Sequence, residues 1–323
     1  MLGISHGSAG GVSILKRRDM RKDIEFKTTD GTTLRGWHYL PDGSGKHATI
    51  VMAHGFSAVK EMYLDKFADA FAKAGFASVV YDNRNFGASD GQPRQEIDPW
   101  LQVRDYSDAI TFALSLDQTD AARIGVWGSS YSGGHVLVVA AIDRRVKCVV
   151  SQVPFISGSQ GTRRLVRADF LAGLFAQCAE DRRDRAAGKP PAMIPVVDEN
   201  PLAVSALPTA DSYKWFSETH KSRAPAWRNE VTLKTIEYGF GYEPGAYIGN
   251  ISPTPLLMIV GVTDHLTVAD LAIKAYEQAY EPKKLVLLPG GHFDAYVEEF
   301  DQACQPACEW FAAHLLPKDR RRQ

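Results

Sequence analysis

The stretch RIGVWGSSYSGGHVLVVAAI, residues 123–142, predicts a strand that turns sharply into a helix. An apolar strand over 123–127 leads into a short run of glycine and serine, and a second apolar run over 131–142 continues as a helix. Ser130 lies at the tip of this turn, where the crowded backbone holds a residue in strained dihedral angles. Its neighbours two positions away must be small, and Gly128 and Ser132 meet that requirement. The turn therefore presents Ser130 as a candidate nucleophile.

Two other serines compete for this role. The literal pattern G-x-S-x-G occurs around Ser5, but no strand precedes it and a glycine-rich tail follows. Centring the turn on Ser129 places the bulky Trp127 two residues before the nucleophile. We therefore assign the nucleophile to Ser130.

A serine hydroxyl is a weak nucleophile at neutral pH and needs a neighbouring base. His292, in LPGGHF at 288–293, follows the last predicted strand, and the loops at this end of an open α/β sheet carry its chemistry. Of the other eight histidines, His265 is the closest rival.

The third member of such a triad orients the base and stabilises its charged form. Asp264 follows the strand over 256–260 through Gly-Val-Thr, and Thr267 is expected to cap the next helix, which leaves Asp264 free for this task. Asp270 is the less suitable carboxylate because it falls within that helix. The chain order is then serine, aspartate, histidine.

Acyl transfer also needs hydrogen-bond donors for the oxyanion of the tetrahedral intermediate. One is the backbone N–H that follows the nucleophile, at Tyr131. For the second we choose the N–H of Phe56, because His54-Gly55-Phe56 follows the strand over 49–53 and Gly55 permits a close backbone approach.

Strands and helices alternate along most of the chain, which predicts an α/β fold with a mostly parallel central sheet flanked by helices. Asp23–Thr28 and Leu34–Leu40 are expected to form an antiparallel hairpin at its edge. The remaining strands are expected at 49–53, 76–81, 123–127, 146–153, 256–260 and 284–288. Helices are expected at 61–74, 100–116, 131–142, 269–280 and 294–315.

The alternation stops between Phe155 and Ile251, where prolines interrupt the chain and no strand is expected. We interpret this part as an inserted helical cap, which divides the chain into a first core part (1–154), the cap (155–250) and a second core part (251–323). One helix is expected over 163–184. The aromatic residues gathered between Tyr213 and Tyr247 either line an apolar acyl pocket or form the core of the cap.

Two groups of arginines lie in the cap. Arg163, Arg164 and Arg167 offer charges for an anionic group on a substrate. Arg182, Arg183 and Arg185, interleaved with aspartates, are expected to form a solvated face.

Composition excludes several classes of protein. The 323 residues carry 37 basic and 38 acidic side chains, so a basic surface for nucleic acid is not expected. No apolar run approaches the ~18 residues of a membrane span, and no secretory signal is recognised. The four cysteines are expected as free thiols in a cytoplasmic protein, without a metal site or another cofactor.

Five motifs, taken in their order along the chain, resemble those of an α/β-hydrolase-fold serine hydrolase. They are HGF (54–56), YDNRNFGASDG (81–91), GSSYSGG (128–134), GVTD (261–264) and LPGGHFDAY (288–296). Within that superfamily the chain is similar to the S15-like peptidases, the dienelactone-hydrolase-like esterases, and the thiohydrolases and polyketide transferases of fungal clusters. The resemblance implies ester or thioester chemistry without a metal or organic cofactor. Asp82 and Arg84 are expected to shape the loop after their strand.

We therefore expect a serine hydrolase that cleaves a small-molecule ester or thioester through an acyl-enzyme on Ser130. An acyltransferase would use the same triad with an alcohol or amine as acceptor, and sequence does not separate the two. A non-catalytic ligand-binding protein of this fold is the third alternative, although no triad member is missing. The sequence does not decide whether the protein forms homo-oligomers.

Overall fold

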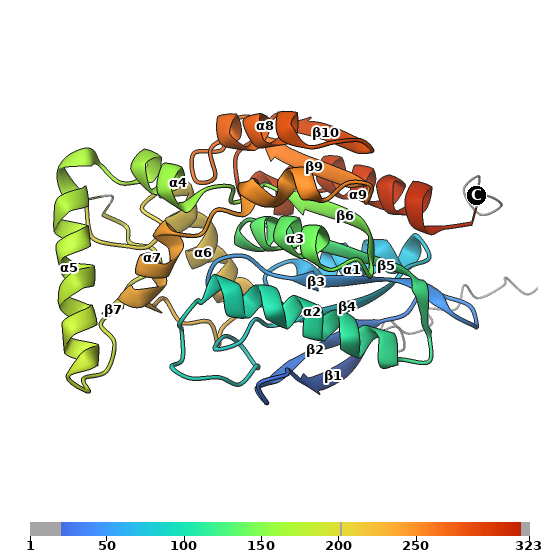
Figure 1. Ribbon diagram of the computed structural model, residues 1–323, viewed down its shortest axis with the longest axis horizontal. Coiled ribbons are helices and arrows are strands. Elements are labelled where there is room, and N and C mark those ends of the chain that lie inside the picture. Colours follow the sequence, from blue (N-terminus) through green and yellow to red (C-terminus); the bar gives the residue numbers. More distant parts are fainter. Residues whose placement is uncertain (1–20, 201, 318–323) are drawn as a thin grey trace, which may run out of the picture.

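A computed structural model describes residues 21–200 and 202–317. Its central sheet has eight strands in the order β1-β2-β4-β3-β5-β6-β9-β10 (Figure 1). The strands are β1 (Arg21–Lys27), β2 (Thr33–Tyr39), β3 (His47–Ala53), β4 (Ala77–Tyr81), β5 (Thr119–Ser129), β6 (Val146–Gln152), β9 (Leu256–Gly261) and β10 (Lys283–Leu288). β1 and β2 form the predicted antiparallel hairpin, β2 also pairs antiparallel with β4, and all other neighbours are parallel. The predicted α/β-hydrolase architecture is confirmed.

Helices cover both faces of this sheet, which is why its inner strands are apolar along their whole length. They are α1 (Leu64–Lys73), α2 (Pro99–Ser115), α3 (Tyr131–Ile142), α8 (Ala269–Gln278) and α9 (Phe300–Leu315). α1 packs against α9 on one face, and α2 packs against α3 on the other (Figure 1). α1 buries Leu64, Phe67 and Phe71 along one stripe, at the spacing that predicted it.

The last predicted helix, 294–315, is shorter than expected. Residues Asp294–Tyr296 form a separate 3-10 turn, η2, and α9 begins only at Phe300. The Asp294 carboxylate accepts the N–H of Gly291 from its own loop, and the Asp294 carbonyl accepts the N–H of Glu299. These bonds fold the segment after His292 into a compact turn.

The segment between β6 and β9 adds no strand to the large sheet. It contains α4 (Gly158–Leu165), α5 (Ala168–Ala186), β7 (Met193–Ile194), α6 (Ala210–Ser222), β8 (Val231–Thr232), α7 (Leu233–Phe240) and η1 (Pro244–Asn250). Its helices α4 to α7 lie together beyond one end of the sheet, with α5 outermost (Figure 1). The division into 1–154, 155–250 and 251–323 stays a prediction.

Two expectations for this segment were wrong. No strand was expected, but β7 and β8 pair over two residues each. One helix was expected over 163–184, but Val166 and Arg167 have extended backbone angles and separate α4 from α5. The side chain of Ser157 caps α4 and fixes where that helix begins.

No helix among the described residues is long and apolar enough to cross a membrane.

Candidate active site

Ser130 occupies the turn between β5 and α3 with φ 60° and ψ −119°, in the left-handed range that L-residues seldom adopt. Its backbone is held on both sides, since its N–H donates to the Gln152 carbonyl and its carbonyl accepts the N–H of Phe155, each at 2.9 Å. A Cβ on Gly128 would overlap the Ser132 carbonyl, so glycine is required there. The small Ser132 fits its own position and donates its hydroxyl to the His54 carbonyl. The turn has the steric demands that the sequence predicted.

The imidazole of His292 lies between Ser130 and Asp264. Its Nε2 is 2.9 Å from Ser130 Oγ, and its Nδ1 is 2.7 Å from Asp264 Oδ2. His292 and Asp264 are 1% and 4% exposed, so this pair is screened from water. Burial alone would raise the pKa of Asp264, but the charge and hydrogen bond of His292 together with the donors from Thr267 hold it below its ordinary value. Asp264 is therefore ionised beside the base.

Thr267 does not have the role expected from sequence. Val268 is the N-cap of α8, and no side chain caps that helix. Instead Asp264 Oδ1 accepts the N–H groups of Leu266 and Thr267, both at 2.8 Å, and so closes its own turn. The Thr267 hydroxyl lies 2.9 Å from Asp264 Oδ2 and 3.1 Å from His292 Nδ1. This contact was missed because a threonine just before a helix is usually its cap.

The loop after β3 passes close to the nucleophile. A Cβ on Gly55 would lie 2.7 Å from the Cβ of Ser130 and 3.1 Å from the N of Tyr131, so only glycine permits this approach. The His54 carbonyl anchors the loop by accepting from the side chains of Asn83 and Ser132. Phe56 and Tyr131, the two expected oxyanion donors, both line the cavity that contains Ser130.

Buried ion pairs hold the loops behind the site. Asp82 accepts the Lys60 ammonium at 2.7 Å and also the backbone N–H of Lys60 and Ala88. Arg84 binds Asp105 through two nitrogens. These contacts agree with the structural role expected for Asp82 and Arg84.

The rival residues lie elsewhere. The side chain of His265 is exposed, and Asp270 pairs with Arg164 and Lys274 at the surface. His135 is buried between Gln102 and Tyr242. Ser5 lies outside the described residues.

The cap arginines have partners. Arg164 pairs with Asp270 at 2.8 Å and Arg167 with Asp169 at 2.7 Å, so two of the three arginines proposed for an anionic substrate are already neutralised. Arg182 and Arg185 both bind Glu237 of α7. The side chain of Arg182 is 67% exposed and Arg183 is exposed, as expected for a solvated face, but Arg182 and Arg185 also connect α5 to α7.

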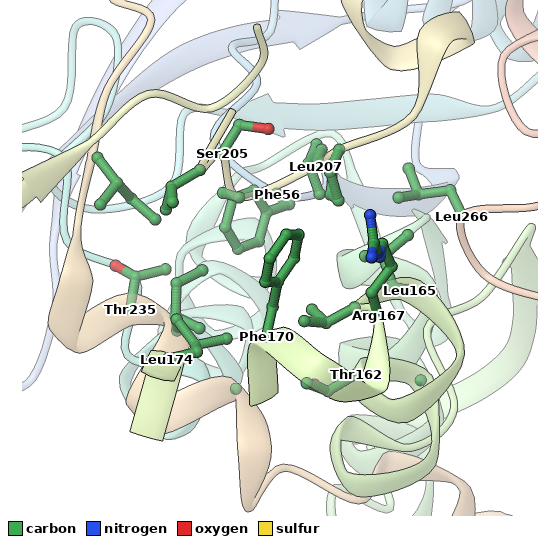
Figure 2. Close-up of a pocket in the computed structure, with 18 of the residues that line it drawn as sticks. Phe56, Thr162, Leu165, Arg167, Phe170, Leu174, Ser205, Leu207, Thr235 and Leu266 are labelled. Carbon is green, nitrogen blue, oxygen red and sulfur yellow. The ribbon is translucent and has the colours of Figure 1, made fainter. Parts of the chain in front are cut away.

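A cavity of about 470 Å³ opens from Ser130 into the cap. Its aromatic lining comes from Phe56, Tyr131, Phe155 and Phe170, with Leu165, Leu174, Leu207 and Leu266 around them (Figure 2). Phe155 and Phe170 were not singled out from sequence, because each is a lone aromatic without a motif around it. The later aromatics Trp215 and Phe216 pack on Phe293 instead.

Among residues 21–200 and 202–317, no group of three or more histidine, cysteine, aspartate or glutamate side chains could hold a metal ion. All four cysteines are free, and Cys304 and Cys308 lie one turn apart on α9.

Known proteins resemble this chain along most of its length. Residues 30–294 match the family model described as X-Pro dipeptidyl-peptidase (S15 family). A thiohydrolase of Eupenicillium brefeldianum is 34% identical over 85% of this chain and 88% of its own length. The polyketide transferase claH of Penicillium crustosum is 29% identical, over 85% and 91%. The crystal structure of the α/β hydrolase GrgF from Penicillium sp. sh18 superposes with a TM-score of 0.80 at 26% identity, covering 91% of this chain and 99% of that one.

Proposed function

The chain belongs to the S15 family of α/β hydrolases, and we propose that it is a serine hydrolase that cleaves an ester or thioester through an acyl-enzyme on Ser130. One observation carries the proposal: an unbroken series of hydrogen bonds runs from Asp264 through His292 to Ser130, at the mouth of an apolar cavity. Each member follows the carboxyl end of a parallel strand, where an open α/β sheet places its chemistry.

In the first half of the proposed reaction, Ser130 Oγ attacks the acyl carbonyl and His292 Nε2 takes its proton. Asp264 fixes the tautomer of His292 by accepting from Nδ1–H and stabilises the imidazolium that forms. The N–H groups of Phe56 and Tyr131 bind the oxyanion. The tetrahedral intermediate then expels the alcohol or thiol, which leaves with the proton from His292.

In the second half, water attacks the acyl-enzyme and gives its proton to His292. The tetrahedral intermediate collapses, His292 returns the proton to Ser130 Oγ, and the carboxylic acid leaves. No group outside the chain, the substrate and water is needed to balance these steps.

The charges in the cavity favour an ester or thioester over the peptide that the family description names. A peptide amino terminus needs an unpaired carboxylate to bind it. Asp169 is the only carboxylate among the described residues that line the cavity, and Arg167 already pairs with it. A neutral acyl group meets no uncompensated charge in this lining.

Substitution of the nucleophile and the base tests the proposal. We expect Ser130→Ala and His292→Ala each to lower turnover of nitrophenyl esters by about a thousandfold or more. His265→Ala, which removes a neighbouring exposed imidazole, is the matched control and should leave turnover unchanged. A fluorophosphonate probe should label the wild type at Ser130, and retained activity in Ser130→Ala would remove the mechanism.

An acyltransferase is the second candidate, because a relative of similar length is named as a polyketide transferase. An alcohol or amine would then replace water in the second half of the reaction. Product analysis in the presence of a competing alcohol separates the two: the free acid as the main product supports a hydrolase, and the new ester as the main product supports a transferase.

A further inference from the structure

Three glycines that line the cavity lie within helices: Gly161 in α4, Gly173 in α5 and Gly239 in α7. A glycine makes a helix less stable than alanine does, so its presence there needs a reason. None of the three has a positive φ. A Cβ on Gly173 would meet no atom within 4 Å, and on Gly161 or Gly239 the nearest atom would be 3.9 Å away. Neither backbone conformation nor crowding therefore requires glycine at these positions.

Two of these glycines face the side chains of residues whose backbones adjoin Ser130. The atom nearest to a Cβ on Gly161 belongs to the ring of Phe155, whose N–H donates to the Ser130 carbonyl. The atom nearest to a Cβ on Gly239 is the hydroxyl of Tyr131, the residue after the nucleophile. The missing side chains of both glycines widen the cavity beside the groups that surround Ser130.

Gly173 belongs to a different part of the cavity. Phe170, Gly173, Leu174 and Gln177 line it from α5, at the spacing of a single helical face. Figure 2 shows Phe170 reaching into the middle of the pocket toward Phe56, with Leu174 and Thr235 on one side and Leu165 and Leu266 on the other. Since Leu266 follows the triad aspartate by two residues, the side with Leu174 is the far end, and Gly173 lengthens it.

The face of α5 that contains Gly173 is not part of the hydrophobic core of the described residues. Cys178 and Asp181 are the only residues of this helix that are buried, and Phe170 is 47% exposed although it lines the cavity. An apolar helix face that lies over a cavity instead of a core is explained by a ligand that covers it. The cavity contains Ser130, so a substrate bound there reaches this apolar face.

We infer that the three glycines select the acyl group: Gly161 and Gly239 admit a branch next to the scissile carbonyl, and Gly173 admits a long apolar chain that continues past Phe170. This inference rests on the proposed function and adds the substrate class to it. The substrate is an ester or thioester of a neutral acyl group that is both long and substituted near its carbonyl.

Ratios of kcat/KM between paired substrates test each position. Isobutyrate and butyrate esters of nitrophenol have the same carbon count and differ in the branch, whereas dodecanoate and butyrate differ in length. We expect the wild type to accept isobutyrate and to prefer dodecanoate over butyrate. Gly161→Leu should lower the isobutyrate-to-butyrate ratio about tenfold or more, and Gly173→Leu should lower the dodecanoate-to-butyrate ratio by a similar factor.

Ala172→Leu is the matched control, because Ala172 is exposed, lies next to Gly173 on the same helix and does not line the cavity. It should leave both ratios unchanged. Leucine favours a helix more than glycine does, so the variants are expected to fold. If fluorophosphonate still labels Ser130 but both ratios stay at their wild-type values in Gly161→Leu and Gly173→Leu, the inference is wrong and the proposed function stands. If fluorophosphonate does not label the wild type and the wild type cleaves no ester, the proposed function is wrong.

Discussion

The hydroxyl of Thr267 joins the two halves of the candidate active site. Its Oγ1 lies 2.9 Å from both the Val153 carbonyl and Asp264 Oδ2. Val153 is a β-branched residue with φ 35°, a strained conformation that its surroundings must hold in place. Gln152, the residue before it, accepts the N–H of Ser130. Thr267 thus connects the backbone that fixes the nucleophile to the carboxylate that fixes the base.

We predict that Thr267→Val lowers kcat about tenfold to a hundredfold with little change in KM. A hydrogen bond to a charged group contributes about 1.5–3 kcal/mol, and valine keeps the shape of threonine without the donor. Loss of the donor also raises the pKa of Asp264 from its lowered value, so the part of kcat that depends on an ionised Asp264 should be lost at a higher pH than in the wild type. Thr267→Ser, which keeps the hydroxyl, should recover most of kcat. Wild-type kcat and an unshifted acid limb in Thr267→Val would contradict this positioning role.

The sequence predicted that the three candidate site residues lie close together, because each follows a strand. Ser130, Asp264 and His292 come after three apolar strands, and parallel strands bring such loops to one edge of a sheet. Thr267 was assigned wrongly because its hydroxyl has acceptors on two distant segments. The spacing of residues along the chain does not predict such a contact.

At the scale of elements, salt bridges connect α5 to α7, beside an edge-to-face contact between Phe175 and Phe240. Arg182 Nε and Arg185 Nη2 donate to the Glu237 carboxylate of α7 at 2.7 and 2.8 Å. Arg185 also pairs with the buried Asp181, which accepts the N–H of Ala192 as well. Because few apolar side chains of α5 are buried, these contacts decide how closely the helix covers the cavity.

We predict that Glu237→Gln loosens α5 while Ser130 stays reactive. The pairs are partly exposed, so the loss in free energy of unfolding should be no more than about 1 kcal/mol. Amide hydrogen exchange within α5 should become faster, whereas exchange in α3 should not change. Glu218→Gln, a change in the cap at a glutamate with no arginine partner among the described contacts, is the control. Unchanged exchange in α5 would show that the salt bridges do not hold it.

The break between α4 and α5 shows why sequence misjudged this element. Val166 and Arg167 are neither glycine nor proline, and the apolar residues continue at helical spacing across them. Leu165 of α4 and Leu174 of α5 both line the cavity. Periodicity therefore indicates a common apolar surface but does not indicate that two helices form it. From β3 to β6 the same reasoning succeeded, because a helix lies between each strand and the next along the chain.

For the whole molecule, the alternation of strands and helices predicted the mostly parallel sheet, and the place where it stops predicted the inserted helical segment. The cavity does not follow from either. Its lining combines Phe56 from the loop after β3 with residues of α4, α5 and α7 and the segment over 202–208. Such a surface exists only when all these parts are folded, so composition and spacing along the chain could not define it.

Folding also lowers the pKa of three buried histidines outside the candidate triad, which couples the stability of the whole molecule to pH. Burial lowers the pKa of His38 and His54 to about 4 and that of His135 to about 3. An unfolded chain protonates histidine near pH 6.5. Below that pH the unfolded state therefore binds more protons than the native state, and stability falls as the pH drops from about 6.5 toward 4.

We predict that each of these histidines lowers the free energy of unfolding by up to roughly 1.4 kcal/mol for each pH unit of acidification in this window. The free energy of unfolding, measured with urea at several values between about pH 7 and pH 5, should decline through these histidines, while the pKa of Asp105, raised by burial to about 6, offsets part of the decline. His135→Gln keeps hydrogen-bonding groups for Gln102 and Tyr242 but cannot bind a proton, so the decline should be shallower than in the wild type. His265→Gln, at an exposed site, should leave the slope unchanged. If the wild type and His135→Gln give parallel curves, His135 is not a source of the acid sensitivity.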